Sequence, residues 1–277
     1  MRSFLAIFSL VSLLSCSERL PENSAGSRST AADSASPNES NDDAERCLDE
    51  WQQVGEGVRY RTAGCAEAGS AFMLHVVELD PQRWSIDAVD GPRRPIADVV
   101  ADGAPFAINA NFFDVNDRSL GLIVSRGKEL RQVHPVSWQS IFSIDRRDQA
   151  RITRRDDWQR TPPDVVTAVQ AGPRLIIDGK RNDVAKATPS LRSGVCITGQ
   201  GQVRFFVTPP GSYGDVHEMV ELAAKSERED GMGCSDAMLF DGGPSAQMYL
   251  DTPGKKISID GDVVTAFLIA KPDTKTQ

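Results

Sequence analysis

Four segments of this 277-residue chain place polar side chains and glycines where an apolar run of residues ends. Two of the segments carry the carboxylates Asp114 and Asp241, and another begins with Arg192. A carboxylate can act as a base or a nucleophile, and the planar guanidinium group of an arginine can bind a phosphate with two parallel hydrogen bonds. Glycines beside such residues allow the backbone to approach a ligand closely.

The four segments occur in a fixed order along the chain. They are Asn109-Ala110-Asn111-Phe112-Phe113-Asp114, then Gln170-Ala171-Gly172-Pro173-Arg174-Leu175, then Arg192-Ser193-Gly194-Val195, and last Asp241-Gly242-Gly243-Pro244-Ser245. An Asp-Gly-Gly sequence alone is common in turns and would carry little information. The order of all four is the stronger signal.

In this order the segments resemble the Asn-x-x-Phe-Phe, Gln-x-Gly-Pro-x-Leu, arginine and Asp-Gly-Gly-x-Ser motifs of the phosphodiester glycosidase family. This family includes the uncovering enzyme, which removes N-acetylglucosamine from a phosphodiester. The resemblance spans roughly Val54 to Ala270 and implies a hydrolase that cleaves a sugar-1-phosphate ester without a cofactor. Two departures, Pro244-Ser245-Ala246 in place of Gly-Ser-Ser and Gly194-Val195-Cys196 after the arginine, leave the substrate open.

The resemblance and the chemistry together assign roles to the charged residues. The phosphate monoester that departs is a good leaving group, so a fixed cation on the phosphate helps more than a strong general acid. Arg192 is the first candidate for that cation and Arg174 the second, and a structural salt bridge is the alternative role. Asp241 is the first candidate for the carboxylate that activates water or attacks the sugar, and Asp114 is the second. Either aspartate could instead cap its own loop.

The remaining candidate residues are polar or small. Asn109 and Asn111 are expected to bind sugar hydroxyls or position water, unless they bond to the backbone of a turn. Phe112 and Phe113 are expected mainly in the core, with one of them as a candidate sugar platform. The other candidates for substrate contact are Gln170, Gly172, Gly242, Gly243 and Ser245.

The elements that must position these residues are mostly short strands. We predict a hairpin of His75–Leu79 with Trp84–Val89, a short helix over Pro95–Ala101, and a helix over Asp215–Glu227 with Ser212 as N-cap. Few helices among successive strands predict an α+β fold, a single domain of mostly antiparallel or mixed sheet with the site at strand ends. The further predicted strands are 106–109, 120–125, 141–144, 151–153, 165–168, 175–177, 193–198, 203–207, 237–240, 247–250 and 263–270, and 154–164 is the predicted long surface loop.

The first 46 residues predict export and anchoring. Residues 1–16 combine a positive start, an apolar stretch and Leu13-Leu14-Ser15-Cys16, which resembles a bacterial lipobox with Cys16 as the lipidated residue. The alternative is ordinary signal cleavage. Residues 17–46 are almost free of large apolar side chains and predict a disordered tether, and residues 47–277 form the folded domain. We therefore expect a lipid-anchored protein of the bacterial cell envelope, on the periplasmic face of the outer membrane.

The cysteines predict disulfide bonds, and the net charge excludes one class of binding partner. Without Cys16, four cysteines remain, and of the three pairings we favour Cys47–Cys65 and Cys196–Cys234 as disulfides of an exported protein. A net charge of −8 argues against nucleic acid as a partner.

We expect no protein-built metal site. The sequence shows no Cys/His cluster. The segment Asp114–Asp117 begins like a calcium loop, but Arg118 occupies the next ligand position. The family resemblance and the predicted lipid anchor give the expected partners, which are a sugar phosphodiester or envelope glycan and the membrane.

Two other functions remain open from the sequence. The protein could be a non-catalytic glycan-binding or scaffold lipoprotein that keeps the fold without the activity. It could also be a phosphodiesterase that cuts the P–O bond, for which a metal requirement would be the sign.

Overall fold

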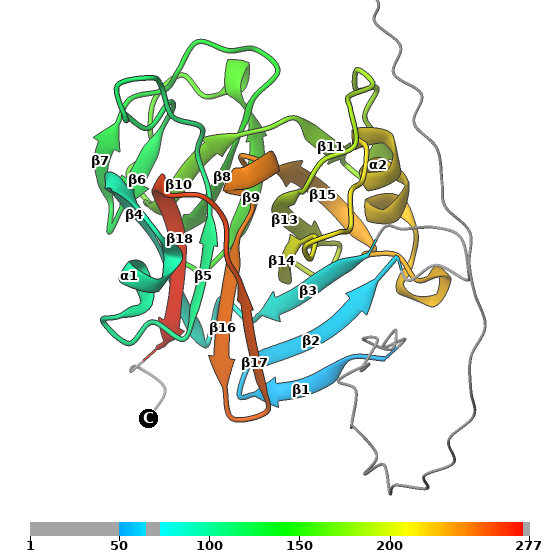
Figure 1. The fold of residues 1–277 in the computed structure, drawn as a ribbon. Coiled ribbons are helices and arrows are strands. Elements are labelled where there is room, and N and C mark those ends of the chain that lie inside the picture. The colour runs from blue at the N-terminus through cyan, green and yellow to red at the C-terminus, as the bar shows by residue number, and fades with distance from the viewer. Residues whose placement is uncertain (1–49, 65–72, 274–277) are drawn as a thin grey trace, which may run out of the picture. The chain divides into compact units, whose positions relative to one another are not determined.

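Three antiparallel β-sheets form the framework of the protein (Figure 1). The computed structural model describes residues 50–64 and 73–273, which belong to one compact unit. All strand pairings in these residues are antiparallel, and two α-helices accompany them. The predicted α+β domain of mostly antiparallel sheet is therefore confirmed.

One sheet has eight strands and the other two have five each. In spatial order, the eight-stranded sheet consists of β1 (Gln52–Gly55), β2 (Val58–Ala63), β3 (Leu74–Leu79), β14 (Val203–Val207), β13 (Ser193–Thr198), β15 (Cys234–Leu239), β11 (Arg174–Ile177) and β12 (Lys180–Arg181). The second sheet consists of β7 (Lys128–Arg131), β6 (Ile123–Ser125), β10 (Val165–Ala171), β8 (Ser140–Asp145) and β9 (Ala150–Arg154). The third consists of β17 (Lys255–Ile259), β16 (Met248–Thr252), β5 (Phe106–Asn109), β18 (Val264–Pro272) and β4 (Trp84–Arg94).

The helical segments are short. The α-helices are α1 (Ile96–Val100) and α2 (Val216–Ala224), and the 3₁₀ turns are η1 (Arg155–Asp157), η2 (Glu227–Glu229) and η3 (Gly243–Ser245). In the parts of the chain that are described, no helix is both long and apolar enough to span a bilayer.

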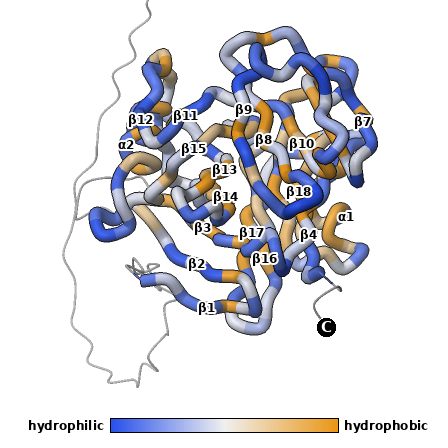
Figure 2. The backbone as a smooth tube through the Cα atoms, turned by 180° about the vertical axis from the view of Figure 1, so that it is seen from behind, coloured by the Kyte–Doolittle hydropathy of each residue, from blue (hydrophilic) through white to orange (hydrophobic). Residues whose placement is uncertain are grey.

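The central strands β3, β14 and β13 of the eight-stranded sheet are buried on both faces, whereas its edge strands β1 and β12 are largely exposed. On β13, Val195 and Ile197 join the main core with residues of the other two sheets, while Cys196 joins a second core beneath α2. Side chains alternate between the faces of a strand, so the two cores divide the strand residue by residue. Figure 2 shows the hydrophobic residues gathered on the strands, with mostly hydrophilic loops around them.

Helix α2 has a capping box at its start, and its N-cap is not the predicted residue. Asp215, not Ser212, is the N-cap: its carboxylate accepts from the Glu218 N–H, and the Glu218 side chain bonds back to the Asp215 N–H. The Ser212 hydroxyl instead bonds to the backbone of Met73. The helix ends at Ala224, before the predicted Glu227, because Ser226 begins a second capping box for η2.

The predicted hairpin of His75–Leu79 with Trp84–Val89 is wrong. β3 pairs with β2 and β14, whereas β4 pairs with β18 in a different sheet. The turn after Leu79 is present, since the N–H groups of Arg83 and Trp84 both donate to the Asp80 carbonyl. It carries the chain from one sheet to another and does not pair the two strands.

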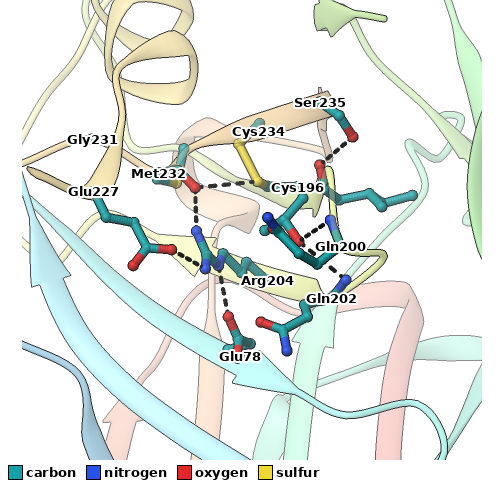
Figure 3. The surroundings of a disulfide bond; sticks show 12 residues. Glu78, Cys196, Gln200, Gln202, Arg204, Glu227, Gly231, Met232, Cys234 and Ser235 are labelled. Carbon is teal, nitrogen blue, oxygen red and sulfur yellow. Dashed lines mark hydrogen bonds and ion pairs between the residues drawn. A yellow bond between two sulfur atoms is a disulfide. The ribbon is translucent and has the colours of Figure 1, made fainter. Parts of the chain in front are cut away.

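A disulfide joins Cys196 on β13 to Cys234 on β15, as predicted. Figure 3 shows Arg204 beside it, in contact with the carboxylates of Glu78 and Glu227 and the carbonyl of Met232. This buried cation is therefore paired on two sides, and it holds the η2 loop against the sheet. Cys16, Cys47 and Cys65 lie outside the described residues.

Candidate active site

All four sequence segments meet at the end of β15, around the backbone of Asp241. The Asp241 carbonyl accepts from the Asn109 side-chain amide at 2.7 Å and from the Ser193 hydroxyl at 3.3 Å. The Asp241 N–H donates to the carbonyl of Ala110 at 3.0 Å. Two residues before Asp241, at the last residue of β15, the Leu239 N–H donates to the carbonyl of Pro173 at 3.0 Å. The third sheet and both neighbours of β15 thus fix this strand end.

The order of strands explains this convergence. β15 lies between β13 and β11 and runs antiparallel to both. The starts of β13 and β11 therefore lie at the same edge as the end of β15. The chain segments before those two strands, with Arg192 and Gly172-Pro173, consequently flank Asp241.

Burial dominates the electrostatics of Asp241. Desolvation raises the pKa of its carboxyl group from 3.8 to about 6, while hydrogen bonds from the Ser245 side chain and the Gly242 N–H act in the opposite direction. A carboxyl group with a pKa near neutrality can exchange protons at physiological pH, which suits acid–base or nucleophilic catalysis.

Arg192 lies beside the Asp-Gly-Gly turn. A Cβ placed on Gly242 would stand 3.6 Å from Arg192 Nη1 and 3.0 Å from the Leu191 carbonyl, so only glycine leaves this gap open. The Arg192 guanidinium donates to the carbonyls of Gly214 at 3.2 Å and Thr188 at 2.9 Å. Among the described residues it forms no ion pair, and burial lowers its pKa. The structural salt bridge considered for Arg192 is absent from this part of the chain.

A cavity of about 630 Å³ opens at this edge. That volume suits a ligand of the size of a substituted sugar. Asp241 stands between two of the lining residues, Phe240 and Gly242. The other lining residues are Phe112, Ser137, Trp138, Gln139, Ser140, Arg154, Gly172, Pro173, Arg174, Ile177, Asn182, Asp183, Val184, Ala185, Ala187, Arg192, Val216 and Leu239.

The predicted amide residues are buried and bond within the protein. Asn109 also accepts from the Gln247 N–H at 3.1 Å, so both ends of its side chain hold backbone. Gln170 uses its whole amide group on protein partners, whereas Asn111 donates to two backbone carbonyls and its Oδ1 is buried without a partner among the described residues. Asn109 and Asn111 thus bond to the backbone, as in the alternative considered for the two asparagines.

Asp114 caps its own loop, as in the alternative considered for it. Its carboxylate accepts from the N–H groups of Asn116 at 2.8 Å and Arg118 at 3.0 Å. The Arg118 hydrogen bond is the main cause of the lowered pKa of this carboxyl group. Neither Asp114 nor Asp241 is itself a lining residue of the cavity. Asp241 lies in the chain between two lining residues and Asp114 does not, so the structure does not bring the two predicted carboxylates together there.

Of the other predicted residues, two line the cavity and two lie in the turn after Asp241. Gly172 and Arg174 line it, and Arg174 pairs with Asp236 at 2.5 Å. Gly243 adopts a positive φ of 61°, which allows the turn after Asp241. Ser245 is buried and directs its hydroxyl to the Asp241 carboxylate.

The sequence reasoning missed Trp138 and Arg154. Trp138 is half exposed, lines the cavity and meets Phe112 edge-to-face with ring centroids 5.7 Å apart. Phe113, by contrast, packs against Arg93. An aromatic residue in an otherwise polar loop was the available signal for Trp138. Arg154 is exposed and lines the cavity.

No metal site is apparent in residues 50–64 and 73–273. No three His, Cys, Asp or Glu side chains in these ranges gather closely enough to hold an ion. The groups that the protein itself offers at this edge include a desolvated carboxyl group, an arginine without an ion-pair partner among the described residues and two aromatic rings.

The sequence model of the phosphodiester glycosidase family matches residues 102–276, which contain all four segments. The chain belongs to this family. No curated protein sequence matches the chain.

Two solved structures are similar to this phosphodiester glycosidase family member. One is the catalytic domain of zebrafish N-acetylglucosamine-1-phosphodiester alpha-N-acetylglucosaminidase, auto-inhibited by its propeptide: TM-score 0.59 and 16% identity, over 81% of this chain and 88% of that one. The other is a hypothetical protein from Synechocystis: TM-score 0.54 and 14% identity, over 79% of this chain. The match spans 62% of the Synechocystis chain, less than two thirds of its length. At such identities both likenesses establish a shared fold.

Proposed function

We propose that the protein hydrolyses a sugar-1-phosphodiester at the anomeric carbon. The observation that carries the proposal is the pairing of a desolvated carboxyl group, Asp241, with Arg192, a cation without an ion-pair partner among the described residues, at the edge of one sugar-sized cavity. Family membership supports it. The zebrafish relative is named for the removal of N-acetylglucosamine from such a phosphodiester.

The reaction follows from these residues. Arg192 binds the phosphate and stabilises the negative charge that grows on it as the C1–O bond breaks. Asp241, in its ionised form, either removes a proton from the attacking water or attacks C1 itself, in which case water then hydrolyses the covalent sugar ester on Asp241. The products are the free sugar and a phosphate monoester on the aglycone. Ser245 and Gly242 hold the carboxylate, and Trp138 with Phe112 provides an apolar face for the sugar ring.

The cellular setting is also proposed as the bacterial envelope, with the chain anchored through lipid on Cys16. The lipobox-like sequence Leu13–Cys16 and the Cys196–Cys234 disulfide, which suits an oxidising compartment, support it. Metabolic labelling with a radioactive fatty acid tests the anchor. The label should enter the wild-type chain and be absent from Cys16→Ala.

Turnover of UDP-N-acetylglucosamine and a panel of methyl sugar-1-phosphates in ¹⁸O-water tests the reaction. We expect ¹⁸O in the released sugar, unchanged rates in EDTA, and rates at least 100-fold lower for Asp241→Asn and Arg192→Ala. Asp98→Asn and Arg146→Ala, which remove exposed charges distant from the cavity, serve as matched controls.

Other outcomes would redirect the proposal. Label in the phosphate, with a metal requirement, would establish P–O cleavage. Saturable binding of the whole panel without turnover would favour a glycan-binding protein. A loss of activity in Asp114→Asn as large as that in Asp241→Asn would restore Asp114 as a second carboxylate of the site.

A further inference from the structure

Three arginines line the cavity although the chain as a whole carries a net charge of −8. They are Arg154, Arg174 and Arg192, and the acidic residue among the lining residues is Asp183. A concave surface with an excess of one charge raises the local concentration of ligands of the opposite charge. The excess is therefore a property of this cavity and does not follow from the composition of the protein.

Two of the three cations, Arg154 and Arg192, have no ion-pair partner among the described residues, although the charge of Asp215 acts on Arg192. Arg174, by contrast, pairs with Asp236. Among the described residues, Arg192 bonds only to the carbonyls of Gly214 and Thr188, and the side chain of Arg154 forms no hydrogen bond or ion pair. A guanidinium group has five N–H donors and no acceptor, so its unused donors can bind the anionic or carbonyl oxygens of a ligand.

Arg174 is the most constrained of the three. Its side chain is 9% exposed, and Nη2 pairs with Asp236 at 2.5 Å. Its Nε is buried and has no partner among the described residues. A buried donor without a partner costs free energy, so a ligand that engages this guanidinium gains from a group already dehydrated.

The strand order spreads these cations along the cavity. β15 separates β13, which follows Arg192, from β11, which begins at Arg174, and two strand spacings place their backbones about 10 Å apart. Arg154 comes from a different sheet, where it pairs with Ser140, another lining residue. One phosphate beside Gly242 can be reached by Arg192 but is too small to occupy all three.

We propose that the substrate carries a second anionic group, a phosphate or a carboxylate, separate from the scissile phosphate. Arg192 binds the scissile phosphate, and Arg154 with Arg174 binds the second group. This inference rests on the proposed function and makes its substrate class narrower: a polyanionic glycosyl phosphodiester, not a neutral sugar on a single phosphate.

Binding of α-D-glucose 1,6-bisphosphate and α-D-glucose 1-phosphate to the full-length chain tests the proposal by calorimetry. The bisphosphate should bind at least tenfold more tightly at low salt. Arg154→Gln should weaken bisphosphate binding about tenfold and change monophosphate binding less than twofold, because it removes only the second contact. Glucuronic acid 1-phosphate, as a third probe, distinguishes a carboxylate from a phosphate.

Two further variants separate the effect from general electrostatics and from misfolding. Arg146→Gln makes the same charge change on an exposed turn outside the cavity and should alter neither affinity. Arg174→Lys keeps the charge and the ion pair with Asp236 but removes the planar guanidinium group that forms two parallel hydrogen bonds. It should therefore reduce the preference in affinity for the bisphosphate while the protein stays folded.

Equal affinities of the wild type for the two glucose phosphates, no binding of either, or the same response in Arg154→Gln and Arg146→Gln would overturn the proposal. The proposed function fails separately. A bisphosphate preference without turnover of any phosphodiester would refute hydrolysis and leave the second subsite standing. Turnover of a phosphodiester without a preference for the bisphosphate would refute the second anionic subsite and leave hydrolysis standing.

Discussion

Replacement of Asp241 by asparagine should make the protein more stable above pH 6 while it abolishes activity. Burial raises the pKa of this carboxyl group from 3.8 to about 6, so the folded state holds the proton more tightly than the unfolded state. The stabilisation from this proton is complete below pH 3.8 and is lost as the pH rises through about 6. At neutral pH the folded wild type therefore carries the cost of a desolvated charge.

The size of the effect follows from the shift. A shift of about 2 pH units corresponds to about 3 kcal/mol, an upper limit because Asp241 is only partly buried. Linkage places about 2 kcal/mol of this between pH 4.5 and pH 8. Asparagine keeps the shape and one acceptor oxygen but has no charge. The stability of Asp241→Asn relative to wild type should thus increase by up to about 2 kcal/mol over that interval.

Urea unfolding of both proteins at pH 4.5 and pH 8 measures this difference. Other titrating groups, such as Asp236, whose pKa burial also raises, contribute equally to both proteins and cancel. Asp98→Asn, at an exposed carboxylate on α1, is the matched control and should show no such change. If the stability difference between Asp241→Asn and wild type is the same at both pH values, Asp241 is not a desolvated carboxyl group and the reasoning fails.

Three further predictions concern catalysis and the fold. Because Asp241 acts in its ionised form, kcat/KM for a turned-over phosphodiester should rise through pH 6 and then level off, and a fall over this range would contradict the base or nucleophile role. Gly194→Ala should destabilise the protein by about 1–3 kcal/mol or more in urea unfolding, since its methyl group would stand 2.4 Å from a backbone oxygen and from an aromatic ring; Gly199→Ala, with open space around it, should cost far less. The double substitution Cys196→Ser/Cys234→Ser should lose about 2–4 kcal/mol, because the bond closes a 38-residue separation, and an unchanged urea midpoint would show that the bond contributes nothing to stability.

The strand content could be predicted because its signals are local. β5, β13 and β14 have the predicted boundaries, since each is a run of apolar residues bounded by turn residues. The Cys196–Cys234 pair was one of the pairings that the four remaining cysteines allowed, and it is the favoured pairing that the structure shows. The partners of β3 and β4 were not accessible, because strand pairing depends on which faces are buried in the final fold. Adjacency in sequence is only the commonest solution.

The site, like the fold, has features that the sequence shows and features that only the tertiary structure decides. Residue types and order were sufficient to identify the family and to nominate Asp241 and Arg192, because the sequence itself shows glycine and charged residues where apolar runs end. Whether a polar side chain faces a ligand or holds the backbone depends on its neighbours in space. Asn109 and Asn111 have the residue types of a sugar site, yet the side-chain N–H groups of both donate to backbone carbonyls that would otherwise be buried without partners.

Arg154, which the sequence reasoning overlooked, has no distinguishing signal in the sequence and belongs to the site only through the tertiary structure. Arg154 resembles the other surface arginines in sequence, and only the packing of the second sheet against the first places it on the cavity wall. The pKa of Asp241 is likewise absent from the sequence, because desolvation is the sum of atoms contributed by strands distant along the chain. The sequence by itself determined which groups are present at the strand ends, and the tertiary structure decided which of them are dehydrated, which are neutralised and which are left to meet a ligand.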